Sequence, residues 1–228
     1  MATTTQRIDA LQGTLRKSLV LAMRQVGISP RGTIKKLPYI FIIGYNKCGT
    51  TALQRFFYLN GYPAIHWDQN RLGLRIIHNL VKRRRILSGY DRRYRVFSDF
   101  NISNEYLAIE LNHLVAKFML DYPDSYFILN TRPVEHWIRS RASQVSRENG
   151  TKYIEIRAEQ LSCRTEEIAD RWRKDWELHH QFVRRFFSGA KANKLLEVDI
   201  EDNSTPDRIG EFLGFEPVRG SWRRVRTN

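Results

Sequence analysis

The residues best suited to chemistry lie in the segment 44–51, which reads Gly-Tyr-Asn-Lys-Cys-Gly-Thr-Thr. This segment stands between a short apolar run and the start of a helical pattern. A glycine-flanked loop at such a junction lets successive backbone N–H groups converge on an anion, and the helix N-terminus adds the positive end of its dipole. We therefore expect the segment to bind a phosphate group.

The position of the lysine separates this loop from the P-loop of enzymes that use nucleoside triphosphates. The spacing from Gly44 to Gly49 matches the glycines of that motif, but Thr50 follows Gly49 where the motif has lysine. The lysine stands inside the loop instead, at Lys47. A lysine at this place reaches a different part of the ligand from one on the first helical turn.

A second candidate anion site follows a later apolar run. Residues 126–130 read as a buried strand, Arg132 comes just after it, and Ser140 stands eight residues beyond Arg132 on the next helical segment. Eight residues make a little over two helical turns, so Ser140 can lie on the face nearest the arginine. Arginine suits a phosphate because its planar fork donates two parallel hydrogen bonds.

The sequence Lys47-Cys48-Gly49-Thr50-Thr51 resembles the phosphosulfate loop of the sulfotransferases that use 3′-phosphoadenosine-5′-phosphosulfate. The resemblance implies that Lys47, Cys48, Gly49, Thr50 and Thr51 belong to the donor site, with the loop amides and threonines on the 5′-phosphate. It also implies that Lys47 contacts the bridging oxygen of the leaving group. The family's second motif, an arginine with a serine eight positions on, would place Arg132 and Ser140 on the 3′-phosphate.

The resemblance covers roughly residues 39 to 215, because residues 195–199 and 209–214 are similar to the family's closing strand and last helix. One departure is Ala52, where many cytosolic members carry a tryptophan, so the residue that stacks on the adenine is open. Three basic residues near the C-terminus resemble a late glycine-and-arginine loop of the family only weakly: Arg219, Arg223 and Arg224.

Sulfuryl transfer to a hydroxyl needs a base that accepts the acceptor's proton. Many carbohydrate and tyrosine sulfotransferases place a glutamate soon after the first helix, and at that place this chain has Asp68, our first choice, and His66, our second. Cytosolic relatives use a histidine after a later strand, which makes Asp99 the third candidate. Asp68 is equally well explained as the N-cap of a helix over residues 71–87.

A metal site is not expected, because the other histidines lack ligand spacing such as His-Glu-x-x-His. By analogy with phosphoryl transfer, positioning and electrostatics would carry most of the rate. Cys48 and Cys163 are too few for a disulfide framework, which favours a reducing compartment.

These residues need elements to hold them in place. The continuous apolar run 39–43 predicts a buried parallel strand, and a helix is expected from about residue 51 to 60. Further strands are expected at 94–98, 126–130 and 194–198. Two helices are expected from apolar residues at helical spacing: Leu107, Leu111, Leu114, Val115 and Phe118 for one, and Ile168, Trp172, Phe182, Val183 and Phe186 for the other. This alternation predicts an α/β fold, a single domain with a mostly parallel central sheet flanked by helices.

We divide the chain into a basic N-terminal helical arm over residues 1–36 and a sulfotransferase-like domain over residues 37–228. Lysine and arginine number 38 against 24 acids, a net charge of +14 that points to anionic partners. With 42% apolar residues the chain is expected to fold rather than stay disordered. No stretch approaches the roughly 20 apolar residues that span a bilayer, so a cytoplasmic location is expected, with peripheral membrane contact left open.

Three alternatives compete with the sulfotransferase interpretation. A small-molecule kinase of the P-loop type would share the fold and use residues 195–199 to bind magnesium, but it lacks the lysine after Gly49. A cysteine phosphatase would use Cys48, but Arg55 lies seven positions on, one too far for that signature. A non-catalytic polyanion-binding protein would use the basic residues 82–85, Arg92, Arg93 and Arg95.

Our prediction from the sequence is a sulfotransferase that acts on a hydroxyl or amine acceptor. A carbohydrate or glycolipid acceptor is favoured by the position of Asp68. No recognised nucleic-acid module surrounds the basic residues, so nucleic acid is not an expected partner. We expect the basic run instead to help an acidic or already sulfated acceptor to approach.

Overall fold

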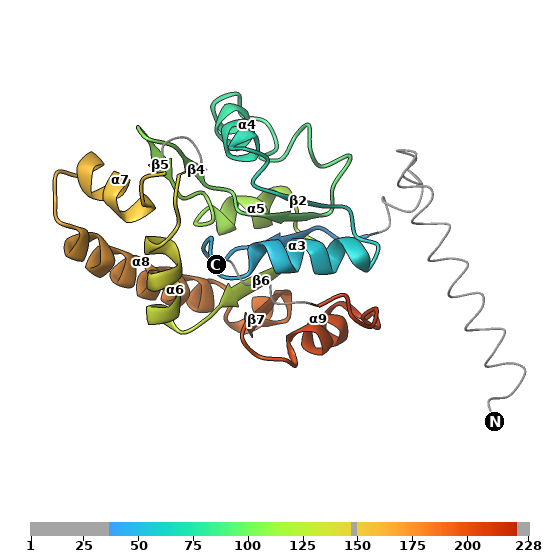
Figure 1. The fold of residues 1–228 in the computed structure, drawn as a ribbon. Coiled ribbons are helices and arrows are strands. Elements are labelled where there is room, and N and C mark those ends of the chain that lie inside the picture. Colours follow the sequence, from blue (N-terminus) through green and yellow to red (C-terminus); the bar gives the residue numbers. More distant parts are fainter. Residues whose placement is uncertain (1–36, 147–149, 223–228) are drawn as a thin grey trace, which may run out of the picture. The chain divides into compact units, whose positions relative to one another are not determined.

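In the described residues, the central sheet has five parallel strands in the order β2-β3-β1-β6-β7 (Figure 1). The computed structural model describes residues 37–146 and 150–222, so the expected arm over residues 1–36 lies outside the described residues. The strands are β1 (Ile40–Ile42), β2 (Ala64–His66), β3 (Val96–Ser98), β6 (Tyr126–Thr131) and β7 (Leu195–Asp199). A separate antiparallel pair joins β4 (Ile102–Ser103) to β5 (Ala108–Ile109).

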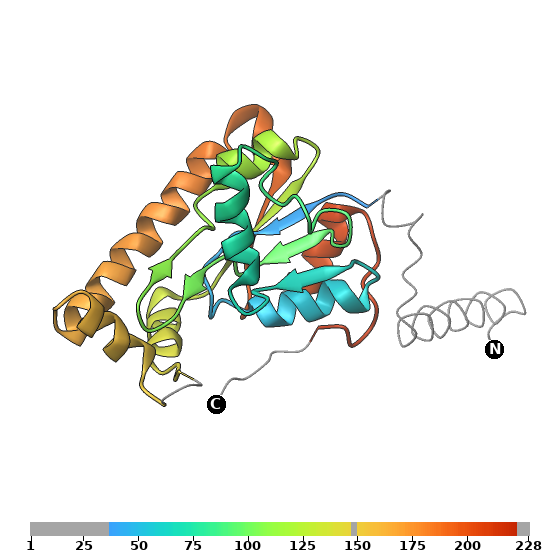
Figure 2. The same ribbon diagram turned by 90° about the horizontal axis from the view of Figure 1, so that it is seen from above.

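Helices connect the strands and cover the sheet. They are α3 (Thr50–Leu59), α4 (Arg71–Val81), α5 (Val115–Asp121), α6 (Val134–Ala142), α7 (Tyr153–Gln160), α8 (Thr165–Phe186), the 3-10 helix η1 (Gly189–Lys194) and α9 (Thr205–Leu213). The two views together place α4 and α9 on opposite sides of the strands, whose arrows all point the same way (Figure 2). The predicted α/β class with a parallel central sheet is confirmed.

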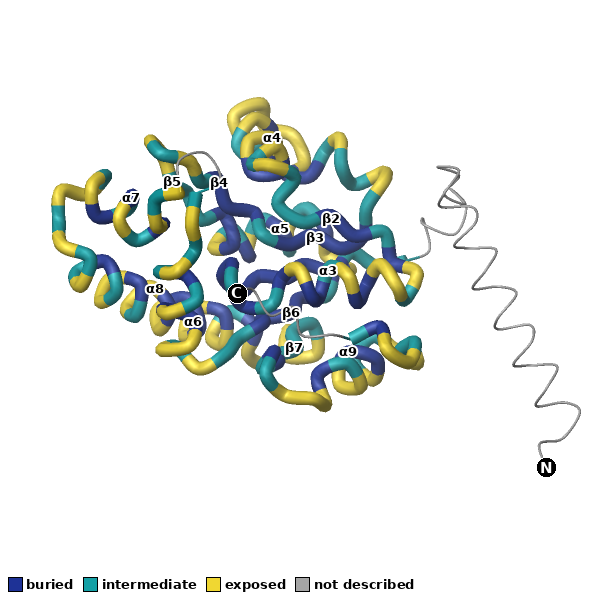
Figure 3. Tube along the Cα trace, viewed as in Figure 1, coloured by how far each residue is buried: buried dark blue, intermediate teal, exposed yellow. Residues whose placement is uncertain are grey.

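Burial explains why β1 reads as an unbroken apolar run. Ile40, Phe41 and Ile42 are all completely buried, as expected for a strand covered on both faces. Phe41 packs in one cluster with residues of α4, α5 and the end of α8, while α3 packs against β2 and β3. In Figure 3 β2 and β3 are mostly dark blue, whereas α4 carries many exposed residues.

The predicted helix over residues 107–118 is wrong in its first half. Asn104 Oδ1 accepts hydrogen bonds from the N–H groups of Tyr106 and Leu107, and the turn that these bonds make leads into β5. The helix, α5, begins only at Val115. Leu107 is exposed, so its apolar side chain matched the helical spacing by coincidence.

Two other helices differ in detail from their predictions. The helix expected over residues 71–87 ends at Val81, as α4. The aromatic-rich helix is present as α8, but Phe182 is 42% exposed. The buried face of α8 runs instead through Ile168, Trp172, Trp176, His179, His180 and Val183.

Candidate active site

The segment 44–49 forms a tight loop between β1 and α3, and side chains from β6 and α6 hold it. Trp137 donates from Nε1 to the carbonyl oxygen of Asn46, at 2.9 Å. Arg132 donates to the carbonyl oxygen of Lys47, at 3.2 Å. Asn130 accepts from the Gly44 N–H and donates to the carbonyl oxygen of Cys48. The loop carbonyls are therefore already bonded on the protein side.

The loop amides, unlike the loop carbonyls, are mostly not bonded to the described part of the protein. In the described ranges, the N–H groups of Lys47, Gly49, Thr50 and Thr51 donate no hydrogen bond to the protein. Two of them lie in the first turn of α3, where a helix has no internal acceptors. Lys47 and Gly49 have φ of 66° and 71°, and alternation of left- and right-handed residues makes a concave nest of N–H groups. The loop can therefore bind an anion through its backbone.

Only glycine fits at the start of the loop. A Cβ atom on Gly44 would lie 2.0 Å from the carbonyl oxygen of Asn130, so any side chain would push β1 and β6 apart. The two glycines of the motif thus have different tasks, since Gly44 permits close approach and Gly49 permits a left-handed turn.

A cavity of about 710 Å³ lies in front of this loop, at the carboxyl ends of the parallel strands. Its lining includes Lys47, Gly49, Thr50 and Thr51 from the loop region and residues that follow the other strands. Ten buried side-chain polar atoms lack a hydrogen-bond partner in the described residues. Six of the ten belong to residues that line the cavity, namely Asn46, Asp99, Asn101, Arg132, Gln144 and Tyr153. Buried polar groups without partners are costly, so their concentration here marks a ligand site.

Arg132 and Ser140 line the same cavity, so the structure brings the two sequence motifs together. Arg132 follows β6 and donates from Nη2 to Glu201 Oε1 at 2.6 Å, and His136 Nδ1 lies 3.1 Å from the other oxygen of Glu201. The Nε–H of Arg132 is buried and has no partner in the described residues. Glu201 thus orients the guanidinium and leaves one donor for a ligand.

Lys47 is half-buried beside these groups. Burial lowers the pKa of its ammonium below the usual value, the Asp99 carboxyl opposes this shift, and the charge of Arg132 adds to it. Two cations held together without a bound anion repel one another, so this end of the cavity suits a ligand that carries negative charge.

Asp99 and His66 meet at the ends of β3 and β2. His66 Nε2 lies 3.5 Å from Asp99 Oδ2 and 3.5 Å from Thr51 Oγ1, and His66 Nδ1 lies 3.2 Å from Ser98 Oγ. Burial raises the pKa of Asp99 to about 7, helped by repulsion from Glu110, and burial lowers the pKa of His66 to about 4. Near neutral pH the imidazole is uncharged, and the Asp99 carboxyl can exchange a proton.

Asp68, our first choice for the base, is not among the residues that line the cavity. Its carboxylate accepts a hydrogen bond from the Tyr90 hydroxyl, and the N-cap of α4 is Asn70 rather than Asp68. The N-cap expectation is therefore wrong, and the role of Asp68 as the base stays a prediction that its position outside the cavity lining does not support.

Cys48 is not among the residues that line the cavity, and its expected part in the donor site stays a prediction that its burial does not support. Its side chain is completely buried in an aromatic cluster, and its N–H donates to the Tyr45 carbonyl. Burial raises the pKa of the thiol, the reverse of what a phosphatase nucleophile requires. Cys48 packs the loop against the core.

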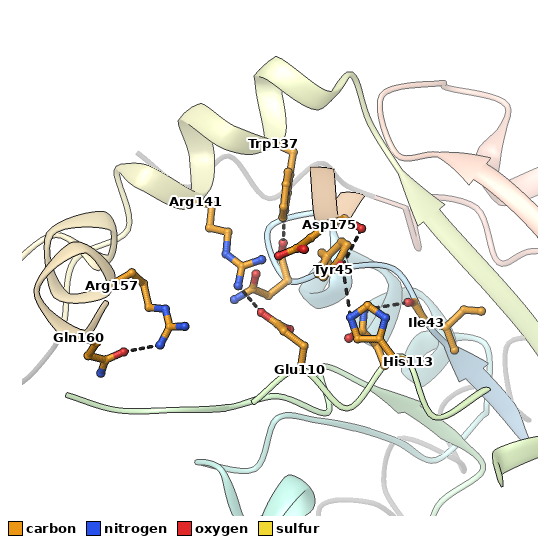
Figure 4. Close-up of polar contacts among 11 residues, drawn as sticks. Ile43, Tyr45, Glu110, His113, Trp137, Arg141, Arg157, Gln160 and Asp175 are labelled. Carbon is orange, nitrogen blue, oxygen red and sulfur yellow. Dashed lines mark hydrogen bonds and ion pairs between the residues drawn. The ribbon is translucent and has the colours of Figure 1, made fainter. Parts of the chain in front are cut away.

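Beneath the loop, Arg141 of α6 forms a buried ion pair with Glu110 (Figure 4). Its guanidinium carbon lies 4.8 to 5.7 Å from the ring centres of Trp172, Trp137, Tyr153 and Tyr45. Because Tyr45 belongs to the loop and Arg141 follows Ser140, this contact fixes α6 relative to the loop. Sequence patterns did not predict this cluster around Arg141, because the residues that form it are far apart in the chain.

The basic residues expected to guide an acceptor lie elsewhere. Arg95 precedes β3 and bonds the carbonyl oxygens of Asp91 and Tyr94, and Arg85 bonds the carbonyl oxygen of Asp121. Both places are at the amino ends of the strands, opposite the cavity. This placement does not support the expected role of the basic run in the approach of an acceptor, and that role stays a prediction.

Three more candidates are placed by the structure. Asp199, the magnesium-binding candidate of the kinase alternative, does not line the cavity and accepts a hydrogen bond from the Glu201 N–H. Arg219 does not line it either, and Arg223 and Arg224 lie outside the described residues. Trp222, which sequence analysis missed, does line the cavity.

In the ranges that the structure describes, no three His, Cys, Asp or Glu side chains gather in a way that could hold a metal ion. No helix there is both long and apolar enough to cross a membrane.

Comparison with known proteins agrees with the geometry. No curated protein matches the sequence. The family described as the sulfotransferase domain matches residues 39–220, which is most of the chain and includes the loop, Arg132, Ser140 and Asp99. The protein is thus a transferase enzyme, and the chain belongs to the sulfotransferase domain family.

Proposed function

We propose that this enzyme transfers the sulfuryl group of 3′-phosphoadenosine-5′-phosphosulfate to a hydroxyl group of an acceptor. The observation that carries the proposal is the asymmetry of the 44–51 loop. Its carbonyl groups are bonded to side chains of β6 and α6, while four amides and the Lys47 ammonium remain for an anion. A volume of about 710 Å³ is also in the range of small-molecule sites.

The residues present fit a donor with two separate phosphates. The amides of Gly49, Thr50 and Thr51 would hold the 5′-phosphate, and Arg132 with Ser140 would hold the 3′-phosphate, in agreement with the resemblance to phosphosulfate-dependent enzymes. The Nε–H of Arg132, which has no partner among the residues that the structure describes, supports this assignment, because a phosphate oxygen would satisfy it.

When bound, the donor supplies a sulfuryl group already activated by its link to phosphate. Lys47 stabilises the negative charge that develops on the departing phosphate oxygen. Asp99, as its carboxylate, accepts the proton of the acceptor hydroxyl. The acceptor oxygen forms a bond to sulfur, the bond from sulfur to the bridging oxygen breaks, and its electron pair stays on the phosphate.

His66 supports Asp99 rather than replacing it. The His66 Nε2 lies within 3.5 Å of both Asp99 and Thr51, so the ring fixes the carboxyl relative to the loop. Its pKa of about 4 makes the neutral imidazole a weak base. We therefore revise the order of candidate bases to Asp99 first and His66 second.

Consumption of labelled nucleotide tests the proposal. The purified chain is incubated with mixed hydroxyl acceptors and either ³⁵S-labelled phosphosulfate in EDTA or γ-³²P-labelled ATP with magnesium. We expect label transfer from phosphosulfate and none from ATP. Transfer from ATP alone would support the kinase alternative and refute the proposal.

A further inference from the structure

The wall of the cavity after β2 has an unusual backbone. Trp67, Asp68, Gln69 and Asn70 are consecutive non-glycine residues with φ between 50° and 66°, in the left-handed region. Each such residue costs on the order of 1 to 2 kcal/mol. Runs of this kind persist only where the surroundings impose them, and they cluster at binding sites.

Specific hydrogen bonds hold this left-handed turn. Asn70 accepts from the Trp67 indole at 2.9 Å and from the Ser103 N–H at 3.0 Å, and its amide donates to the Ser103 carbonyl at 3.0 Å. The Tyr90 hydroxyl donates to Asp68 from the other side. As a result Trp67, Gln69 and Asn70 line the cavity in fixed positions.

Two carboxamides elsewhere in the lining are ready to bind a ligand. Asn101 and Gln144 each have a buried side-chain oxygen that accepts no hydrogen bond in the described residues. Such oxygens need a donor such as O–H or N–H, and the amide nitrogen of the same group can donate in return. A hydroxyl both donates and accepts, so it satisfies this pair of groups.

The charges of the lining disfavour an anionic acceptor. Among its described residues, the only lysine and arginine are Lys47 and Arg132, both assigned to the donor. The acidic residues of the described lining are Asp99, which lies near Lys47, and Glu105. In the described part of the lining, an acidic or already sulfated acceptor would meet Asp99 and Glu105 and would find no lysine or arginine besides Lys47 and Arg132.

We propose that the acceptor is a neutral carbohydrate, bound between Trp67 and the carboxamides of Asn101 and Gln144 with one hydroxyl presented to Asp99. This inference rests on the proposed function. It does not depend on Asp68, from whose position a carbohydrate was first favoured. Trp67 offers a fixed apolar surface for the sugar ring, and the carboxamides form hydrogen bonds with its hydroxyl groups.

Sulfuryl transfer to an array of glycans tests the inference. The full chain is incubated with ³⁵S-labelled phosphosulfate on an array that carries neutral and sialylated or sulfated glycans, and with 2-naphthol in solution as an apolar phenol. We expect label on neutral glycans, with initial rates about tenfold or more above those on anionic glycans and on 2-naphthol. A preference for anionic glycans or for 2-naphthol would overturn the inference.

Variants then test the residues. Gln144→Met removes the carboxamide but keeps the length of the side chain, and Gln181→Met makes the same change at an exposed position on α8. Loss of one hydrogen bond should raise the KM for the best neutral glycan about three- to tenfold in Gln144→Met. Gln181→Met should match the wild type. Asn101→Leu, at a buried position, should act like Gln144→Met if it folds.

Affinity for adenosine 3′,5′-bisphosphate distinguishes a failure of the carbohydrate acceptor from a failure of the proposed function. The bisphosphate Kd should stay within about twofold of wild type in Gln144→Met, because the donor site is intact. Bisphosphate binding without transfer to any glycan would refute the carbohydrate acceptor and leave the proposed function standing. Absence of bisphosphate binding to the wild type would refute the proposed function itself.

Discussion

Lys47 is the residue on which the proposed chemistry depends most. Lys47→Ala should lower the rate of the transfer step about 10²- to 10³-fold, because a preorganised charge on the leaving group is lost. Bisphosphate affinity should fall much less, since the loop amides remain. Single-turnover rates and calorimetric Kd values measure the two effects separately.

The matched control for Lys47 is Lys174→Ala, which removes an exposed lysine from α8. It should leave the transfer rate and the nucleotide affinity at their wild-type values. A Lys47→Ala enzyme with normal single-turnover rate would show that the loop lysine has no role in the transfer.

Asp99 should lower the stability of the folded protein at neutral and higher pH while it supports catalysis. Its pKa is raised to about 7, above the value of 3.8 for a free carboxyl, so the folded state binds this proton more tightly than the unfolded state. Stability is therefore lost as pH rises from about 4 to about 7, by about 1.4 kcal/mol for each unit of difference. Asp99→Asn should lower activity about 10²- to 10⁴-fold and raise the melting temperature at pH 8.

Melting curves of wild type and Asp99→Asn at pH 5 and pH 8 check this prediction. The increase in melting temperature of Asp99→Asn over wild type should be larger at pH 8 than at pH 5. The kcat/KM of the wild type should rise with pH through about 7 as the carboxylate forms. A variant that is less stable than wild type at pH 8, or one that keeps its activity, would contradict the role of Asp99 as a buried base.

Sequence patterns located some residues of the candidate site and missed others for a physical reason. Lys47, Arg132 and Ser140 stand in local motifs with fixed spacing, and they line one cavity. Asn130, which braces both ends of the loop, acts across 86 and 82 residues of sequence, so no local pattern identifies it. Glu201 reaches Arg132 from 69 residues away, through the pairing of β6 with β7.

At the scale of elements, the left-handed turn makes a prediction about stability. Glycine adopts positive φ without strain, so Gln69→Gly should leave the free energy of unfolding unchanged or raise it by up to about 1 kcal/mol. Gln181→Gly places the same change at an exposed position inside α8 and should lower it by about 1 kcal/mol. Urea denaturation of the two variants measures the difference.

The two glutamine variants should therefore move in opposite directions from wild type. Equal destabilisation by Gln69→Gly and Gln181→Gly would show that the turn carries no backbone strain. The inference that its surroundings impose this conformation would then fail.

Strands were easier to predict than helix boundaries in this fold. Buried parallel strands such as β1 and β6 are continuous apolar runs, which few other structures explain. The end of α4 and the start of α5 depend instead on tertiary contacts. Asp121 of α5 accepts the Ile86 N–H, for example, and holds the chain that follows α4.

The whole molecule should lose stability in mild acid because several histidines are buried. Burial lowers the pKa of His66 to about 4 and of His179 to about 3, and it also lowers the pKa of His180. The unfolded state then binds more protons below about pH 6.5, so stability falls as pH drops toward these values. His179 has a buried Nδ1 without a partner in the described residues.

Melting temperatures between pH 7.5 and pH 5 test this prediction in the Asp99→Asn background, because Asp99 acts in the opposite direction. His179→Asn should reduce the fall in melting temperature between pH 7.5 and pH 5, whatever its effect on the melting temperature at pH 7.5. His78→Asn, at an exposed position on α4, should keep the slope. A slope that is equally steep without His179 would contradict the assignment.

The net charge of the whole chain does not show where an anion binds. The net charge of +14 indicated anionic partners, but the basic residues at 82–85 lie at the amino ends of the strands, away from the cavity. Composition predicts the sign of the net surface charge, but only the fold shows which charged residues face the candidate site. In the proposed function, the anion that matters is the donor, which the loop and Arg132 would bind.

The most direct measurement is calorimetric titration of the chain with adenosine 3′,5′-bisphosphate and with adenosine 5′-monophosphate. Wild type and Arg139→Ala, which removes an exposed arginine of α6, should bind the bisphosphate about tenfold or more tightly than the monophosphate. Arg132→Ala should lose about 10- to 100-fold of bisphosphate affinity, as expected for lost hydrogen bonds to a charged group, and keep its affinity for the monophosphate. Equal affinities of the wild type for both nucleotides, or an unchanged bisphosphate Kd in Arg132→Ala, would contradict the account of the donor site.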